Sequence, residues 1–94
     1  PWDGMSDAEV HTRLCKLRGI GPWTADMILI FSLCRPDVLP LGDIGVVRAM
    51  EALYANGDRL GPDALTELAE PWRPFRTVGT WYLWRSLDPE PVEY

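Results

Sequence analysis

Apolar residues recur at helical spacing in the first part of the chain. The sequence SDAE at residues 6–9 is a capping box, in which the Ser6 hydroxyl accepts the Glu9 amide and the Glu9 carboxylate accepts the Ser6 amide. A helix is therefore predicted to begin there and to run to about Lys16, with Gly19 ending it. Its apolar face is formed by Val10, Leu14 and Leu17.

A second helix is predicted to begin at Pro22, because the missing N–H and fixed φ of proline suit the first position of a helix. It is expected to run toward Cys34, and its apolar residues are Met27, Ile28, Phe31 and Leu33. Residues 34–43, CRPDVLPLGD, carry prolines and a glycine without helical period, which predicts a loop. Asp43 closes this loop as a candidate N-cap.

Three further helices are predicted after the loop. The first covers IGVVRAMEALYA after Asp43, the second follows Gly61 and Pro62 and ends near Pro71, and the last begins at Pro74. The buried face of the first of these helices is predicted to be Val46 or Val47, Met50 and Leu53, and that of the second Leu65 and Leu68. In the last helix the predicted buried residues are Val78, Trp81 and Leu83 to Leu87, and Gly79 permits close packing. No stretch of the sequence alternates with a period of two, so the predicted fold class is all-α.

Composition limits the classes of site and location. The 94 residues contain no secretory signal pattern and no long apolar run, so no membrane partner is expected. Cys15 and Cys34 could pair, but buried free thiols are favoured, which indicates a reducing, cytoplasmic setting. With these cysteines and a single histidine, His11, the chain lacks the roughly four ligands of a zinc or iron–sulfur site.

The net charge of −5 counts against broad electrostatic binding of nucleic acid. Its distribution softens this objection, because acidic residues gather in the tail at residues 88–94 while Arg13, Lys16 and Arg18 cluster just before the glycines. The local charge near the glycines can therefore differ in sign from the net charge.

The segment Gly19-Ile20-Gly21 between two predicted helices forms a helix-hairpin-helix. Glycines allow a positive φ and a close approach of another backbone, and the unpaired amides of the following helix start suit a phosphate oxygen. Thr24 adds a hydroxyl donor in the same turn. The alternative for a bare G-x-G is a tight turn between two helices that binds no ligand.

Three longer motifs, LRGIGPWTADMILIFSL, RPDVLPLGDIGVVRAM and WRPFRTVGTWYLW, resemble the helix-hairpin-helix glycosylase superfamily, in its 3-methyladenine DNA glycosylase II branch. The resemblance spans nearly the whole chain. It implies excision of alkylated bases from double-stranded DNA by hydrolysis of the N-glycosidic bond, after the nucleotide is flipped out.

Asp43 falls on the family's essential aspartate, which implies that it stabilises the developing oxocarbenium ion or activates the attacking water, besides capping a helix. Trp23 stands where the bifunctional relatives hold a lysine nucleophile, so the resemblance implies a monofunctional enzyme with Trp23 in the base pocket. The alternative for Trp23 is a core tryptophan. A cationic alkylated base leaves without a general acid, so one carboxylate can suffice.

The resemblance implies no required cofactor and no iron–sulfur cluster, but it does imply a possible Na⁺ or K⁺ ion at the hairpin, held by the backbone carbonyls of Cys15, Leu17 and Ile20. Arg48 is either a DNA contact or a surface residue. The remaining aromatic residues of the last segment, Trp72, Trp81 and Trp84, are interpreted mainly as core, and His11 as a surface or hydrogen-bonded helix residue.

Residues 1–87 are expected to form the C-terminal half of a two-part glycosylase domain, followed by an acidic, proline-rich tail at residues 88–94. The missing N-terminal half would leave apolar faces exposed and favour association, so the chain alone is expected to excise little or nothing. Two other hypotheses stay open: a non-catalytic DNA-backbone-binding module that uses Gly19, Gly21 and Thr24, and a helical interaction domain unrelated to DNA.

Overall fold

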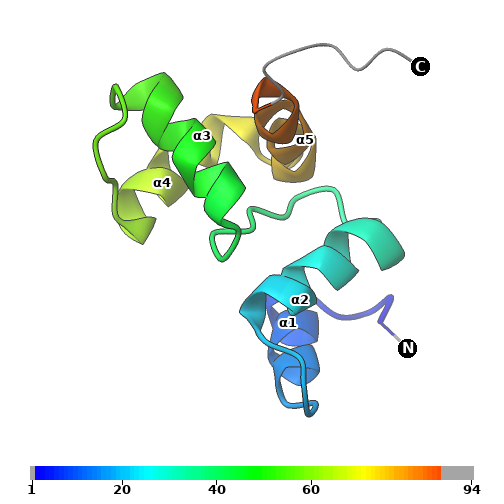
Figure 1. The fold of residues 1–94 in the computed structure, drawn as a ribbon. Coiled ribbons are helices and arrows are strands. Elements are labelled where there is room, and N and C mark those ends of the chain that lie inside the picture. Colours follow the sequence, from blue (N-terminus) through cyan, green and yellow to red (C-terminus); the bar gives the residue numbers. More distant parts are fainter. Residues whose placement is uncertain (1, 88–94) are drawn as a thin grey trace, which may run out of the picture.

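The computed structural model describes residues 2–87, which form helices and no strand (Figure 1). The elements are α1 (Asp7–Cys15), α2 (Pro22–Met27), the π-helical turn η1 (Ile28–Ser32), α3 (Ile44–Tyr54), α4 (Pro62–Ala69), the 3-10 turn η2 (Glu70–Trp72) and α5 (Arg76–Ser86). The predicted all-α class is confirmed for this part. The predicted tail at 88–94 lies outside the described residues. None of the described helices has the length and hydrophobicity needed to cross a bilayer.

The start of α1 is the predicted capping box. The Ser6 hydroxyl accepts the Glu9 amide at 3.1 Å, and the Glu9 carboxylate accepts the Ser6 amide at 3.3 Å. The next helix also begins as predicted, at Pro22, but it does not continue as one α-helix to Cys34. After Met27 the backbone widens into η1, and Cys34 adopts a φ of 54° that ends the helical run.

The helices form two groups with separate cores (Figure 1). The first core lies between α1, α2 and η1, and its buried residues are Val10, Leu14, Ala25, Leu29, Ile30 and Val38. The second lies between α3, α4 and α5, and its buried residues are Val46, Ala49, Met50, Leu65, Ala69 and Leu83. Trp84 packs against both cores, so α5 connects the two groups.

The loop between the groups is held along α5 by hydrogen bonds. The Thr77 hydroxyl donates to the Arg35 carbonyl at 2.7 Å and accepts the Val38 amide at 2.8 Å. Asp37 accepts both Nε and the backbone amide of Arg76, at 2.8 and 3.1 Å. A segment predicted only as a loop is therefore fixed in place, and it leads directly to Asp43.

The buried face of α5 was predicted correctly at Leu83 and wrongly at most other positions. The helix begins at Arg76 rather than at Pro74, and its buried residues are Thr77, Thr80 and Leu83. The predicted core residues Val78, Trp81 and Leu87 are exposed. The two threonines are buried because the carbonyls and amides of the loop supply hydrogen-bond partners for their hydroxyls, which compensates the cost of burying polar groups.

Three other burial predictions are corrected. Leu17 and Leu53 are exposed, because α1 ends at Cys15 before Leu17 and because Leu53 lies at the edge of the α3 face. Cys34 is exposed as well, since it lies beyond the end of η1, and both cysteines are free. The thiols are therefore unpaired as predicted, but only Cys15 is even partly buried.

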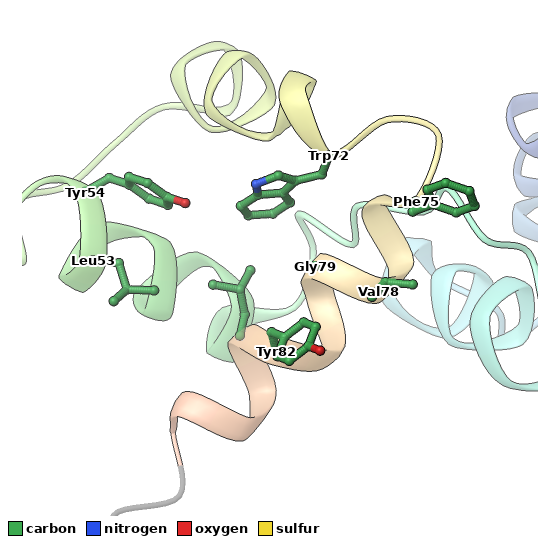
Figure 2. Close-up of a pocket in the computed structure, with 8 residues that line it drawn as sticks. Leu53, Tyr54, Trp72, Phe75, Val78, Gly79 and Tyr82 are labelled. Atoms are coloured by element: carbon green, nitrogen blue, oxygen red, sulfur yellow. The ribbon is translucent and has the colours of Figure 1, made fainter.

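Gly79 permits the close packing that was predicted at α5. A Cβ atom at this position would lie 2.6 Å from Cε3 of Trp72, a distance that real packing does not allow. Beside this contact is an apolar pocket of about 410 Å³. Figure 2 shows it between α3 and α5, with the Trp72 indole directed into it and Leu53 and Tyr82 on its rim. Leu53, Tyr54, Phe75, Val78 and Tyr82, which line this pocket, are exposed.

Candidate functional site

The turn between α1 and α2 contains the two glycines, which have different conformations. Gly19 has a φ of 87°, which L-residues with a side chain rarely adopt. As predicted, the chain changes direction at Gly19, a few residues after the end of α1 at Cys15. Gly21 has a φ of −93° and a ψ of 179°, an extended conformation open to any residue. The expectation of a positive φ therefore holds for Gly19 alone. A Cβ atom at Gly21 would meet only open space, so Gly21 leaves the surface before α2 unobstructed.

The first turn of α2 presents backbone donors at this surface. Gly21 is the N-cap and has no side chain to accept a hydrogen bond, and Pro22 has no N–H. The amides of Trp23 and Thr24 therefore lack partners within the helix. Thr24 itself is partly buried in this turn. Nearby, the basic residues Arg13, Lys16 and Arg18 are all exposed, which puts local positive charge beside the hairpin.

Asp43 lies beside the first turn of α2, the helix that follows the hairpin. As the N-cap of α3, its Oδ2 accepts the Val46 amide at 3.0 Å. Its Oδ1 accepts the indole N–H of Trp23 at 2.8 Å, across 20 residues of sequence. Its Oδ2 also accepts the indole N–H of Trp84 at 2.9 Å. Gly42 contacts the Trp23 backbone, where a Cβ atom would lie 3.6 Å from the Trp23 nitrogen, so the loop and the start of α2 are in contact.

These donors control the charge of Asp43. Desolvation by itself would raise the pKa of the Asp43 carboxyl, but the hydrogen bonds from Trp84, Trp23 and the Val46 amide favour the charged form more strongly. The pKa of Asp43 therefore lies below its ordinary value. The carboxylate is ionised at neutral pH and only partly buried, so it combines a negative charge with access from solvent.

Trp23 is half exposed, with 50% of its surface accessible. The edge that carries its N–H faces Asp43, so the ring is anchored to the carboxylate and is not a core tryptophan. The interpretation of the other tryptophans as core holds in part. Trp72 and Trp84 are half-buried, whereas Trp81 is exposed and makes an edge-on contact with Phe31 at a centroid distance of 5.3 Å.

Arg48 makes an ion pair within its own helix. Its Nη1 lies 2.8 Å from Oε1 of Glu51, a buried carboxylate that is 2% exposed and also accepts the Leu60 amide at 2.9 Å. Arg48 thereby partners a buried charge, and its contact with DNA stays a prediction. His11 is hydrogen-bonded on α1 as expected, with Nδ1 3.7 Å from Sγ of Cys15, and its Nε2 lies 3.3 Å from Oδ1 of Asp26.

The carbonyls predicted to hold a monovalent cation lie at the end of α1 and in the turn. The Leu17 carbonyl accepts the Ile20 amide at 3.2 Å and keeps a second lone pair. The carbonyl oxygens of Cys15 and Ile20 belong to the same short turn, on either side of Leu17. Neutral oxygen donors of this kind suit a hard monovalent ion, and the cation site stays a prediction.

Trp84 is the site residue that the sequence analysis missed, because it was interpreted as core. It lies 41 residues from Asp43, and no sequence spacing predicts their contact. One signal was present: a buried tryptophan usually finds an acceptor for its N–H, and acceptors are rare in an apolar core. Asp43, Trp23 and Trp84 thus come from three segments and meet at one carboxylate.

Comparisons with known proteins agree on one family. No protein-family model matches the chain. Among curated proteins, a putative DNA-3-methyladenine glycosylase of Bacillus subtilis is 37% identical over 89% of this chain and 29% of its own length. A DNA-3-methyladenine glycosylase of the same organism is 34% identical over 88% of this chain and 27% of its own length. DNA-3-methyladenine glycosylase 1 of Schizosaccharomyces pombe is 37% identical over 87% of this chain and 36% of its own length.

A solved structure shows the same relationship in three dimensions. The 3-methyladenine DNA glycosylase from Archaeoglobus fulgidus superposes with a TM-score of 0.73 at 32% identity, covering 86% of this chain and 28% of that protein. The chain thus spans about a third or less of the length of most of these relatives. Over the segment that it spans, the chain matches 3-methyladenine DNA glycosylases in sequence and in fold.

Proposed function

We propose that Asp43 is the catalytic carboxylate of a monofunctional excision reaction on alkylated DNA, and that the hairpin at residues 19–21 holds the DNA backbone beside it. The observation that carries this proposal is the 2.8 Å hydrogen bond between Trp23 and Asp43, which joins the start of α2 to the carboxylate. The relatives named as DNA-3-methyladenine glycosylases supply the reaction class.

In the proposed reaction the bond between sugar and base breaks first. An alkylated purine carries a positive charge and leaves as a neutral base, so the leaving group needs no proton. Positive charge develops on the sugar, and the ionised Asp43 carboxylate stabilises it electrostatically. The same carboxylate then orients a water molecule and accepts its proton as the new bond to the sugar forms. The products are the free base and an abasic site.

The residue at position 23 sets the proposed reaction type. A tryptophan has no amine with which to form a Schiff base, so strand cleavage by that route is not expected here. The N–H edge of Trp23 is occupied by Asp43, while half of the residue's surface stays accessible. Its ring face can therefore stack on an electron-poor base without losing the hydrogen bond.

The hairpin is proposed to bind a phosphate of the DNA backbone. The open surface at Gly21, the unpaired amides of Trp23 and Thr24 and the exposed Arg18 together suit an anionic oxygen. A Na⁺ or K⁺ ion held by the carbonyls of Cys15, Leu17 and Ile20 would supply further positive charge to the same phosphate. DNA as partner also fits a cytoplasmic location for this activity.

Excision is proposed to require polypeptide in addition to these 94 residues. The matching segment is less than a third of the length of these relatives. Apolar residues at the pocket between α3 and α5 are exposed, among them Leu53, Phe75 and Tyr82, and such a face suits contact with further protein. We therefore expect the 94-residue chain alone to release little or no alkylated base.

A chimera tests the function directly. The matched segment of the Bacillus subtilis relative is replaced by this chain, and release of 3-methyladenine and 7-methylguanine from alkylated duplex is measured. We expect excision by the chimera, its loss in the Asp43→Asn variant by at least about a hundredfold, and retained DNA binding in that variant. A chimera that binds DNA and excises equally well with Asn at position 43 would contradict the proposal.

The non-catalytic binding module remains the second candidate, favoured by the hairpin alone. It predicts that Asp43→Asn changes neither DNA binding nor any reaction, and the chimera distinguishes it from the enzyme. Titration of the chain with plain and alkylated duplex at two salt concentrations tests the third hypothesis, since an interaction domain unrelated to DNA would bind neither.

A further inference from the structure

The three donors around Asp43 are distributed unevenly between its two oxygens. Oδ2 accepts the Trp84 indole N–H at 2.9 Å and the Val46 amide at 3.0 Å, whereas Oδ1 accepts only the Trp23 indole N–H, at 2.8 Å. A carboxylate offers about two lone-pair sites on each oxygen. Oδ2 is therefore filled, and Oδ1 keeps one site for a further partner.

We propose that Trp84 is a positioning residue, which fixes Oδ2 of Asp43 and leaves Oδ1 as the oxygen that faces the reacting sugar and water. This inference rests on the proposed function of Asp43. It gives the two tryptophans different roles: Trp84 holds the carboxylate in place, while Trp23 lines the side from which a substrate approaches.

The packing of Trp84 supports a holding role. Its ring stacks on Phe31 with the centroids 5.8 Å apart and the planes 7° from parallel, and Trp81 meets it edge-on at 5.3 Å. Trp84 also packs against both hydrophobic cores. A ring enclosed in this way has little freedom to rotate, so its N–H points at one place. Trp23, by contrast, is 50% exposed.

The space around Oδ2 is also restricted. A Cβ atom at Gly45 would lie 3.2 Å from Oδ2 and 3.1 Å from Cδ1 of Leu87, so a side chain at position 45 would crowd this oxygen. The terminal torsion of an aspartate is broad and nearly two-fold, and the N-cap bond from Val46 can be made by either oxygen. The second donor on Oδ2 makes an exchange of the oxygens costly, because it breaks two hydrogen bonds together.

The chain offers a matched pair of variants for the test. Trp84→Phe removes the N–H and keeps an aromatic ring against Phe31, while Trp81→Phe changes the same aromatic cluster and donates nothing to Asp43. The carboxyl pKa of Asp43 is measured by carbon NMR in the 94-residue protein. We expect Trp84→Phe to raise this pKa by about half a unit to one unit, and Trp81→Phe to leave it within a few tenths.

A second measurement needs no substitution. In the unmodified protein, the indole N–H resonance of Trp84 should shift with pH at the same midpoint as the Asp43 carboxyl. A resonance that does not follow Asp43 overturns the inference, even if Trp84→Phe fails to fold. An equal rise of the Asp43 pKa in both variants also overturns it, because loosened packing would then explain the change.

The effect on the reaction separates positioning from structure. In the chimera, Trp84→Phe should lower kcat at least about tenfold with little change in KM, and should move the acidic limb of the pH profile by the same shift as the pKa. If Trp84→Phe changes neither kcat nor the pH profile, the positioning role of Trp84 is wrong. If excision by the chimera does not depend on Asp43, the proposed function is wrong. The NMR results on the hydrogen bond between Trp84 and Asp43 are independent of that outcome.

Discussion

The indole nitrogen of Trp23 lies 2.8 Å from Oδ1 of Asp43, and this hydrogen bond connects the first turn of α2 with the first turn of α3. The start of α2 and the carboxylate are therefore joined directly, although α2 packs in the first core and α3 in the second. Any change in how the two groups of helices pack would move the carboxylate relative to the hairpin.

Gly19→Ala should destabilise the protein through its backbone. Because Gly19 has a φ of 87°, an alanine there is strained, and we expect the free energy of unfolding to fall by about 1 kcal/mol. Urea unfolding followed by tryptophan fluorescence measures this loss. If Gly19→Ala leaves the free energy of unfolding unchanged, the turn can adopt another conformation.

Gly21→Ala should act on DNA binding instead. Gly21 is extended and open, so an alanine costs about 0.5–1 kcal/mol as a poorer N-cap, but its Cβ atom occupies the surface proposed for the phosphate. We expect a weaker affinity for duplex, by severalfold, in a fluorescence anisotropy titration.

Gly61→Ala is the matched control for Gly21→Ala. Gly61 also precedes a proline at the start of a helix, has a φ of −77° and a ψ of 166°, and leaves open space around its Cα. The two variants should lose similar stability, and only Gly21→Ala should lose affinity. Equal affinities in the two variants would show that the hairpin surface does not bind the backbone.

Gly79→Ala should disturb the packing of Trp72. The added Cβ atom would lie 2.6 Å from Cε3 of the indole, so the ring or α5 must move. Overpacking of this kind costs about 1–3 kcal/mol, and thermal unfolding should show a lower Tm. Gly4→Ala serves as control, because nothing lies within 4 Å of a Cβ atom there. A Tm for Gly79→Ala equal to that of the control would contradict the packing of α5 on η2.

Glu51→Ala should be strongly destabilising. Glu51 is 2% exposed, pairs with Arg48 and accepts the Leu60 amide, so its loss leaves a cavity and an unpaired amide. We expect a loss of about 3 kcal/mol in urea unfolding. Glu67→Ala, an exposed position on α4, should change stability by less than about 0.5 kcal/mol. Similar losses in the two variants would show that the buried carboxylate is not a structural element.

The stability of the protein should fall in acid through Asp43 and Asp37. In both carboxyls, desolvation raises the pKa, but hydrogen bonds to the charged form lower it by more. The pKa in the folded protein therefore lies below the ordinary value of about 3.9. A lowered pKa contributes stability above the unfolded value, and this contribution is lost as the pH falls through the folded pKa. Asp37→Asn and Asp43→Asn should each show a smaller loss of the free energy of unfolding between about pH 5 and pH 2, measured by urea unfolding.

Asp26 should behave in the opposite direction. Its burial raises the pKa, and the attraction of His11 only partly offsets this effect. The folded protein therefore binds this proton more tightly than the unfolded chain, and protonation of Asp26 stabilises the fold as the pH falls through its raised pKa. Asp26→Asn should remove this gain in urea unfolding curves measured above about pH 4. A variant with the same pH dependence as the unmodified protein would show that Asp26 does not titrate differently on folding.

The starts of helices were predictable because they depend on neighbouring residues. Ser6 with Glu9, Pro22 and Asp43 each act within one turn of the chain, and the structure places helix starts at these positions. The sequence predicts the start of α5 two residues too early, at Pro74, because proline suits the first position of a helix, whereas Phe75 is the N-cap. The change from α-helical to π-helical geometry after Met27 had no local signal.

The sequence by itself determined the all-helical class, the hairpin and the presence of Asp43 at a helix start, because short-range hydrogen bonds and apolar periodicity decide these features. Only the tertiary structure decided that Thr77 and Thr80 rather than Val78 and Trp81 face inward, and that Trp84 reaches Asp43 from 41 residues away. These features depend on the loop at residues 34–43 lying along α5, where distant backbone groups supply the hydrogen-bond partners that no local pattern encodes.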